Sequence, residues 1–323
     1  MTVSIIVPMY NAEVYVERCA KSIFEQSYPD LQIIFIDDNS RDRTLQVLQN
    51  IICKYPERQS QIVLRTLDEN LGVANARQIG LDLANGDYVT QIDADDYIST
   101  DYIQNMLDVA TCNNCDIVIC DFVYLLPTRK KYVHVSFDPD PEICLARVMT
   151  GEMHAGFMNK LVRRSLYTQN GFRMVPGLNM FEDKAMMVRL LSSAKVLGYV
   201  PKAMYFYDKT NAHSATAQAK SRQVYYLEKA WEDIENYSFN RLSQTQVMLD
   251  AIEYYRIGIL GSILLFSEKS LAQYKSSIVR RPSVGKIWSH PTIPYSYKLV
   301  LVLYSLKQQW LVSVLRYLYH AMK

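Results

Sequence analysis

Hydrophobic residues in the first hundred positions form two alternating patterns along the chain. Short continuous apolar runs predict strands buried on both faces of a sheet, at residues 3–7, 31–36, 62–64 and 88–92. Between them, apolar residues recur every three or four positions and predict helices, at residues 16–24, 45–52 and 73–84. Repeated strand–helix alternation predicts a mostly parallel α/β sheet with right-handed crossovers.

Polar clusters follow three of the predicted strands, at residues 8–11, 37–40 and 93–96. In open α/β sheets, ligands bind outside the carboxyl ends of the strands, so the clusters predict one shared site. No G-x-G-x-x-G follows the first strand, and no G-x-x-x-x-G-K-[ST] occurs, which disfavours dinucleotide and P-loop sites. An EF-hand loop counted from Asp93 lacks the required glycine and glutamate.

The third cluster places Asp93, Asp95 and Asp96 at a strand end. Three neighbouring carboxylates repel one another unless a cation, hydrogen-bond donors or solvent compensates. A divalent ion that takes one or two protein carboxylates can complete its shell with substrate phosphate oxygens. The alternative for this pattern alone is a solvated acidic turn.

The ordered set of motifs resembles glycosyltransferase family 2, which has the GT-A fold. The matching segments are residues 3–11, 37–40, 70–72, 76–77, 86–88 and 93–96. They cover roughly the first 100 residues, and a weaker similarity continues to about residue 215. In that stretch, residues 159–164 resemble the family's acceptor-side segment, and Phe181-Glu182-Asp183 resembles its "ED" motif.

The resemblance implies sugar transfer with inversion, of hexosyl or N-acetylhexosaminyl type, from a nucleoside-diphosphate donor that is typically UDP-linked. It assigns nucleotide-sugar binding to Pro8, Tyr10, Asp38, Arg77, Asp93 and Ala94, a Mn²⁺ or Mg²⁺ site to Asp93 and Asp95, and the general base to Asp183. It also implies a glycan or lipid-linked saccharide acceptor in surface polysaccharide synthesis.

Elementary chemistry agrees with these assignments. A divalent ion at Asp95 would stabilise the negative charge that develops on the departing diphosphate. In-line displacement needs one base and no enzyme nucleophile, so the lack of a Ser-His or Cys-His pair is no objection. Each residue also has a structural alternative: Asp38 as a turn former, Arg77 as a solvated charge, and Glu182-Asp183 as acids at a helix start.

Composition narrows the possibilities. A net charge of +2 on 323 residues predicts no commitment to nucleic acid. The start of the chain has no basic segment typical of a signal peptide, and the apolar stretches 257–266 and 299–306 are too short to span a bilayer. Six dispersed cysteines predict buried thiols in a cytoplasmic protein. Cys112 and Cys115 have metal-ligand spacing but no second pair.

The rest of the chain predicts a second, helical region. We divide the protein into a GT-A domain at 1–215 and a helical region at 216–323. Polar residues recur along 298–323 as a narrow stripe on an otherwise apolar helix, which predicts peripheral membrane contact at an inner surface, a dimer seam or a docked helix. Lys160 and Arg163 could bind an acceptor or lie on a helix surface, and His213 could be a metal ligand or a surface residue.

Two other functions remain possible from the sequence. A sugar nucleotidyltransferase would share the sheet but needs a glycine-rich basic loop after the first strand, where residues 8–11 offer none. A degenerate GT-A module could bind nucleotide or glycan without catalysis, against which the intact Asp93, Asp95 and Asp183 argue.

Overall fold

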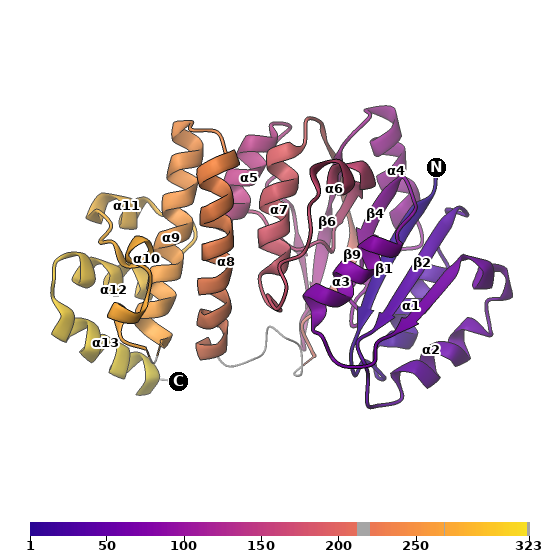
Figure 1. Ribbon diagram of the computed structural model, residues 1–323, viewed down its shortest axis with the longest axis horizontal. Helices are drawn as coiled ribbons and strands as arrows, with labels where there is room; N and C mark the ends of the chain where they lie inside the picture. The colour runs from indigo at the N-terminus through magenta and orange to yellow at the C-terminus, as the bar shows by residue number, and fades with distance from the viewer. Residues whose placement is uncertain (212–219, 268, 322–323) are drawn as a thin grey trace.

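A computed structural model describes residues 1–211, 220–267 and 269–321 (Figure 1). Within these ranges one nine-stranded sheet has the order β3-β2-β1-β4-β8-β6-β9-β5, with β7 paired to β6. The strands are β1 Val3–Met9, β2 Leu31–Asp37, β3 Ile62–Thr66, β4 Tyr88–Gln91, β5 Tyr97–Ile98, β6 Ile117–Leu125, β7 Lys130–Val133, β8 Lys160–Arg163 and β9 Leu197–Asp208.

The first four strands are all parallel, as the sequence predicts. The three polar clusters therefore come to one edge of the sheet. β1 runs on through Pro8 to Met9, whereas the sequence placed Pro8 in the following turn. The ladder between β1 and β4 ends at the pair Ile6 and Gln91. Pro8 thus lies where β1 has lost one neighbour, and its missing N–H costs little there.

Helices cover both faces of the sheet. The helices of the first 211 residues are α1 Val16–Phe24, α2 Thr44–Ile52, α3 Val73–Leu83, α4 Tyr102–Cys112, α5 Pro141–Thr150, α6 Arg164–Asn170 and α7 Glu182–Ser193, with a 3-10 turn η1 at Pro56–Gln61. One hydrophobic core joins the sheet to α1, α2 and α4. A second core joins the other face to α3, α5 and α7 and continues into the later helices.

The middle of the sheet is mixed. β8 lies antiparallel between β4 and β6, and β6 runs parallel to β9 with an irregular register near Asp121. Lys160 and Arg163 therefore lie on a strand, and the prediction of a helix surface is wrong. Lys160 is buried and donates to the carbonyls of His154 and Gly156 and to Asn159.

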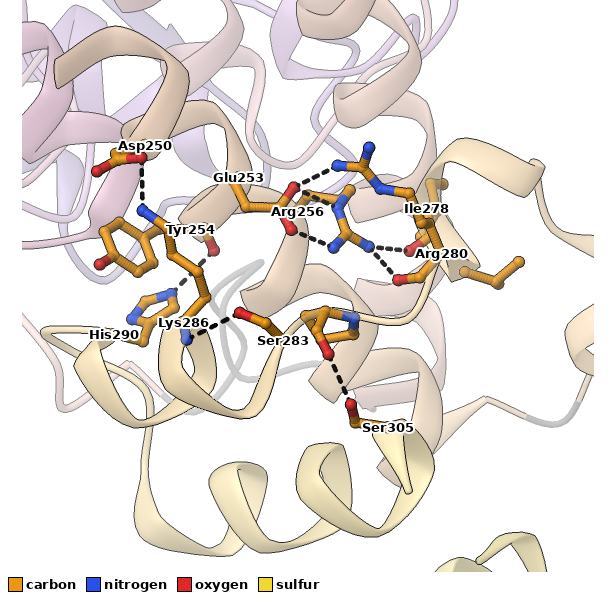
Figure 2. A network of polar contacts seen from close by, with 12 residues as sticks. Asp250, Glu253, Tyr254, Arg256, Ile278, Arg280, Ser283, Lys286, His290 and Ser305 are labelled. Carbon is orange, nitrogen blue, oxygen red and sulfur yellow. Dashed lines mark hydrogen bonds and ion pairs between the residues drawn. The ribbon is translucent and has the colours of Figure 1, made fainter. Parts of the chain in front are cut away.

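The C-terminal region is helical, as predicted. Its helices are α8 Lys220–Arg241, α9 Gln246–Phe266, α10 Ser276–Val279, α11 Val284–Ser289, α12 Tyr295–Ser305 and α13 Gln309–Ala321, with a 3-10 turn η3 at Leu271–Gln273. α9 packs against α5, α8 and α12, so these helices extend the second core. Arg256 on α9 is buried and bonds Glu253 and the carbonyls of Ile278 and Arg280, which fixes α10 to α9 (Figure 2).

The prediction of one continuous terminal helix is wrong. The segment forms α12 and α13, separated at Lys307, whose φ of 64° is left-handed. Because that backbone cannot continue a helix, the chain turns there and α13 packs beside α12 and α9. Among the described residues, no helix is long and apolar enough to cross a bilayer.

The cysteines differ in part from expectation. Cys19, Cys115, Cys120 and Cys144 are buried, as predicted, but Cys53 and Cys112 are exposed. Both exposed cysteines lie at the C-terminal ends of helices, Cys53 after α2 and Cys112 in α4, beyond the last residues of those helices that are buried in a core.

Candidate active site

The loops after β1 and β2 are tied together at the sheet edge. The amide of Asp38 donates to the carbonyl of Met9, and the amide of Asn11 donates to the hydroxyl of Ser40. Asn11 and Asn39 both adopt left-handed backbone conformations, which asparagine tolerates better than most residues. Two polar loops are thereby held as one rigid rim.

Asp38 is buried, and its two carboxylate oxygens accept hydrogen bonds from the amides of Leu71 and Gly72. Burial raises the pKa of Asp38, and the two amide donors partly offset this effect. Asp38 thus positions the turn that opens α3. Unused lone pairs on the same oxygens remain able to accept a further donor.

Gly72 makes the turn possible. Its φ of +85° is left-handed, and a Cβ there would lie 2.2 Å from the side chain of Asn179. Asn179 comes from the segment before α7, so the close approach joins the turn held by Asp38 to the segment that leads to Asp183. The Asn179 side-chain oxygen is buried without a hydrogen-bond partner in the structure.

Pro8 and Tyr10 lie on the same rim. Pro8 is buried at the end of β1, opposite Ile36 of β2. Tyr10 is 46% exposed just beyond the strand. An exposed aromatic ring beside a buried polar edge provides a surface on which a flat heterocycle can stack.

The three acids after β4 separate into two roles. Asp93 is partly exposed and accepts from Arg77, and Asp95 accepts from the Asn211 amide. Asp96 is instead turned into the protein, where its oxygens accept from the Tyr205 hydroxyl and the Asp208 amide. Asp96 therefore anchors β9 to the acidic turn and is not available to a ligand.

Asp95 is the electrostatically costly member of the pair. Burial, together with the charge of Asp93, raises the pKa of Asp95 to about 6. Arg18 of α1 donates to the Asp95 carbonyl and pairs with Asp208 at 2.7 Å. Arg18 thus holds the backbone of the turn, and the Asp93 and Asp95 carboxylates lie close enough to repel each other.

Arg77 connects this turn to α7. Its guanidinium is 2.6 Å from Asp93, 3.4 Å from Glu182 and 3.0 Å from the Gln91 side-chain oxygen. The Phe157 ring covers its face at 5.3 Å. The Arg77 side chain is only 8% exposed, so the alternative that Arg77 is a solvated surface charge is excluded.

Asp183 occupies the first turn of α7, a helix that begins directly after Phe181, whose φ of 64° is left-handed. Its carboxylate lies close enough to Arg77, Lys160 and Lys184 to affect the pKa of each. Burial lowers the pKa of Lys160 and of Lys184 to about 8, and the Asp183 charge opposes that lowering. Asp183 is thus a partly exposed carboxylate with cationic neighbours.

Glu182, beside it, is buried. Burial and the Asp183 charge raise the pKa of Glu182, and Arg77 acts in the opposite direction. The neighbouring His154 is held neutral because burial and Lys160 lower its pKa to about 4. The pair Glu182 and Asp183 therefore divides into a buried structural acid and an accessible one.

The carboxylates at the turn suit a divalent ion bound together with a diphosphate. Within the described residues, no group of three or more His, Cys, Asp or Glu side chains is arranged for a metal. Asp93 and Asp95 together supply two oxygen donors, and their mutual repulsion would be relieved by a cation. Mg²⁺-type ions with phosphate substrates use this small number of protein carboxylates. His213 lies outside the described residues.

The structure brings the predicted residues into two adjoining groups. Pro8, Tyr10 and Asp38 form the rim after β1 and β2, and Arg77, Asp93 and Asp183 meet at the boundary of β4, α3 and α7. Ala94 is buried within the acidic turn. Sequence reasoning missed Arg18 and Tyr205, which hold that turn. Arg18 is one of three charged residues on helix 16–24, so the sequence alone offered no signal for its role.

The site thus combines a parallel sheet edge, an acidic turn, an exposed aromatic ring and a carboxylate across a buried arginine. A family model described as "Glycosyl transferase family 2" matches residues 4–171, more than half of the chain. The protein therefore belongs to glycosyltransferase family 2. The resemblance and the α/β, GT-A type fold expected from it are confirmed.

Two curated relatives and two solved structures show the breadth of this similarity. The uncharacterized glycosyltransferase EpsJ of Bacillus subtilis is 28% identical over 222 residues, 66% of this chain and 62% of EpsJ. The poly(ribitol-phosphate) beta-glucosyltransferase of Bacillus spizizenii is 24% identical over 239 residues, 72% of this chain and 36% of that protein. The chain thus spans less than two thirds of these relatives.

The structures share the fold. Staphylococcus aureus TarS 1–349 in complex with UDP-GlcNAc has a TM-score of 0.69 at 18% identity, over 100% of this chain and 93% of that one. The mannosyltransferase PcManGT of Pyrobaculum calidifontis, in complex with GDP-Man and Mn²⁺, has a TM-score of 0.55 at 17% identity, over 95% and 87%.

Proposed function

We propose that this protein is an inverting, metal-dependent glycosyltransferase that moves a sugar from a UDP-linked donor to a hydroxyl group of a glycan or lipid-linked acceptor. The observation that supports this most directly is the path from Asp93 through Arg77 to Glu182 and Asp183. This path links two places: the acidic turn, where a diphosphate would bind, and Asp183, whose carboxylate would act as the base.

In this proposal the donor nucleotide occupies the rim. Tyr10 stacks on the base, with Pro8 beneath it, and Asp38 accepts the imide N–H of uracil while it holds the turn at Gly72. Arg77, Asp93 and Ala94 line the path from ribose to diphosphate. The TarS complex with UDP-GlcNAc supports the choice of UDP, and the PcManGT complex with GDP-Man supplies the alternative base.

Asp93 and Asp95 would hold Mn²⁺ or Mg²⁺. Such an ion would supply Lewis-acid stabilisation of the diphosphate leaving group. The chain's own part is to keep both carboxylates at the sheet edge, through Arg77 and through the Arg18 contact to the turn. The PcManGT complex with Mn²⁺ supports a divalent ion on this fold.

Asp183 would take the proton. The acceptor oxygen attacks the anomeric carbon as the bond from that carbon to the diphosphate oxygen breaks, and the bonding pair leaves with UDP. The hydroxyl proton passes to the Asp183 carboxylate. Attack opposite the leaving group inverts the configuration. Lys160 and Lys184 lie close enough to interact electrostatically with this carboxylate.

The acceptor is proposed to belong to cell-surface polysaccharide synthesis. The relative named poly(ribitol-phosphate) beta-glucosyltransferase supports an acceptor of that class. An action at the inner face of a membrane is consistent with a lipid-linked acceptor. The domain limits at 1–215 and 216–323 remain a prediction, although the second core runs through both parts.

Thermal unfolding with UDP, GDP and dTDP, each with and without Mn²⁺, tests the donor assignment. A ligand at about a hundred times its dissociation constant stabilises a protein by about 2.7 kcal/mol, which is readily measured as a higher melting temperature. We expect a shift for UDP that requires Mn²⁺. A shift for GDP alone would show that the donor base is guanine and not uracil. No shift with any nucleotide would favour a non-catalytic module.

A further inference from the structure

The charges of this protein are segregated along the chain. All 33 acidic residues precede position 269, together with 26 of the 35 lysines and arginines, so residues 1–268 carry a net charge of −7. The last 55 residues contain nine lysines and arginines and no acidic residue, a net charge of +9. An asymmetry of this size between two parts of one chain is typical of a polyanion-binding surface.

Part of this positive charge holds the fold together. Four basic residues pair with carboxylates on α8 and α9; Figure 2 shows two of these pairs. The pairs are Lys269 with Glu228, Lys275 with Glu232, Arg280 with Glu253 and Lys286 with Asp250. These contacts attach the small helices to the rest of the region.

Four others have no such partner. Within the described part of the chain, no carboxylate lies within ion-pair distance of Arg281, Lys298, Lys307 or Arg316. Among the described residues, the hydrogen bonds of Arg281, Lys298 and Arg316 go to backbone carbonyls, and Lys307 is exposed at the turn between α12 and α13. Their charge is therefore available to an external anion.

The same turn and helix expose large apolar side chains. Trp310 is 66% exposed and Tyr317 73%, and Leu306, Val314 and Leu318 are exposed beside them. Positions 310, 314, 317 and 318 fall on one side of α13, because three- and four-residue steps return to the same face. We call Leu306, Trp310, Val314, Tyr317 and Leu318 the terminal apolar face.

This face is additional to the one that packs inward. Val312 is buried, and Leu315 and Tyr319 pack against the core, with the Tyr319 ring 5.6 Å from Phe266 of α9. α13 is thus apolar on two sides, and only one of them is covered. Tryptophan and tyrosine next to basic residues are the side chains that occupy the boundary between lipid headgroups and acyl chains.

An open groove of about 590 Å³ lies between α10 and α12, lined by Ser276, Ser277, Val279, Arg280, Arg281 and Tyr304. The Arg281 guanidinium lies over the Tyr304 ring at 5.3 Å and pairs with no described carboxylate. A phosphate group entering this groove would therefore meet an uncompensated cation.

We propose that the last two helices form a docking surface for a bilayer that contains anionic phospholipids. The terminal apolar face would enter the headgroup region, and Arg281, Lys298, Lys307 and Arg316 would lie against lipid phosphates. Neither helix spans the membrane, so the contact is peripheral and depends on both apolar burial and charge.

Co-sedimentation of the full chain with phospholipid vesicles tests this proposal, without nucleotide or sugar. We expect binding to vesicles of phosphatidylcholine with phosphatidylglycerol, weak binding to phosphatidylcholine alone, and release by high salt. Trp310→Ser with Tyr317→Ser should weaken binding at least about tenfold, as should Arg281→Glu with Lys307→Glu. Because Trp310 and Tyr317 are exposed, the unfolding temperature of their double variant should stay unchanged.

Phe239→Ser is the matched control. Phe239 is 86% exposed on α8, outside the basic segment, so its loss should leave vesicle binding unaltered. Equal binding to both vesicle types, wild-type binding by the Trp310 and Tyr317 double variant, or equally tight binding to duplex DNA would overturn the proposal. So would a concentration-dependent dimer that Trp310→Ser abolishes. Metal-dependent UDP binding, measured separately, keeps this result distinct from the donor assignment.

Discussion

The Arg77 guanidinium and the Asp93 carboxylate form a 2.6 Å ion pair in which the arginine is 8% exposed and the aspartate 34%. The pair is therefore buried on the arginine side and accessible on the aspartate side. The arginine also faces Glu182 at 3.4 Å, so a single cation compensates one acid from the turn after β4 and one from α7. Removing it should disturb both segments.

Arg77→Met should lower the free energy of unfolding by about 3 kcal/mol, because it leaves buried acids without their counter-charge. It should also weaken metal-dependent UDP binding, because Asp93 loses its orienting partner. Chemical denaturation and nucleotide titration measure the two effects. Adding Glu182→Gln to Arg77→Met should recover part of the stability but not the affinity. Wild-type stability of Arg77→Met would show that the ion pairs contribute nothing.

Asp183→Asn should reduce transfer at least about a hundredfold, because the amide cannot accept the acceptor proton. The UDP-induced thermal shift should remain, since Asp183 lies on the acceptor side of Arg77 in the proposed arrangement. Turnover with a UDP-sugar and a thermal shift with UDP alone separate the two properties. Full activity in this variant would remove Asp183 from the role of base.

Asp95 makes binding dependent on pH. Its folded-state pKa of about 6 lies above the ordinary value of 3.8, so ionisation of Asp95 above pH 6 costs stability in the metal-free protein, and the cost disappears as the pH falls. Mn²⁺-dependent UDP binding should weaken below pH 6 for the opposite reason, since the metal needs the carboxylate.

Asp95→Asn tests both halves of that argument. At pH 7.5 without metal it should stabilise the fold by about 1–2 kcal/mol, because each pKa unit corresponds to about 1.4 kcal/mol and the site relaxes. At pH 5 the gain should be about half as large, because the cost vanishes only below the ordinary pKa of 3.8, and at both pH values the variant should abolish metal-dependent binding. Melting temperatures across this pH range provide the measurement. A variant less stable than wild type at pH 7.5 would contradict the proposed strain.

Gly72→Ala should destabilise the protein by about 1–3 kcal/mol, because alanine strains a φ of +85° and its methyl group meets Asn179. The displaced turn should also break the two hydrogen bonds that the Asp38 carboxylate accepts from backbone amides. UDP affinity should therefore fall. Gly285→Ala is the matched control, since a Cβ at Gly285 meets nothing within 4 Å and its φ is not positive. Comparable losses in the two variants would argue against a specific role for the Gly72 turn.

The sequence predicted the parallel half of the sheet well because its signals are local. Continuous apolar runs and period-3.6 helices identify β1 to β4 and α1 to α3 without reference to distant residues. The antiparallel strand β8 was not predicted. Its pairing with β4 and β6 depends on segments many residues apart, and its buried Lys160 resembles a surface lysine in sequence.

The candidate site shows the same division. Asp93, Asp95 and Asp96 look equivalent in sequence, yet Asp96 is turned inward by Tyr205, which lies more than a hundred residues later. Likewise, the backbone amides that donate to the Asp38 carboxylate belong to a turn more than thirty residues later in the chain. Local pattern can identify a cluster of acids, but which acid remains open to a ligand is decided by partners that only the fold supplies.

The elongated arrangement of the molecule has a geometric consequence. Strands β1 and β2 lie toward one end of its long axis and α12 and α13 toward the other (Figure 1). A protein seated on a bilayer by its last helices would hold β1 and β2 at a distance from the membrane plane. Under the proposed function, a membrane-anchored acceptor would then have to carry enough sugar to extend from the bilayer to Asp183, and shorter precursors would be excluded by length alone.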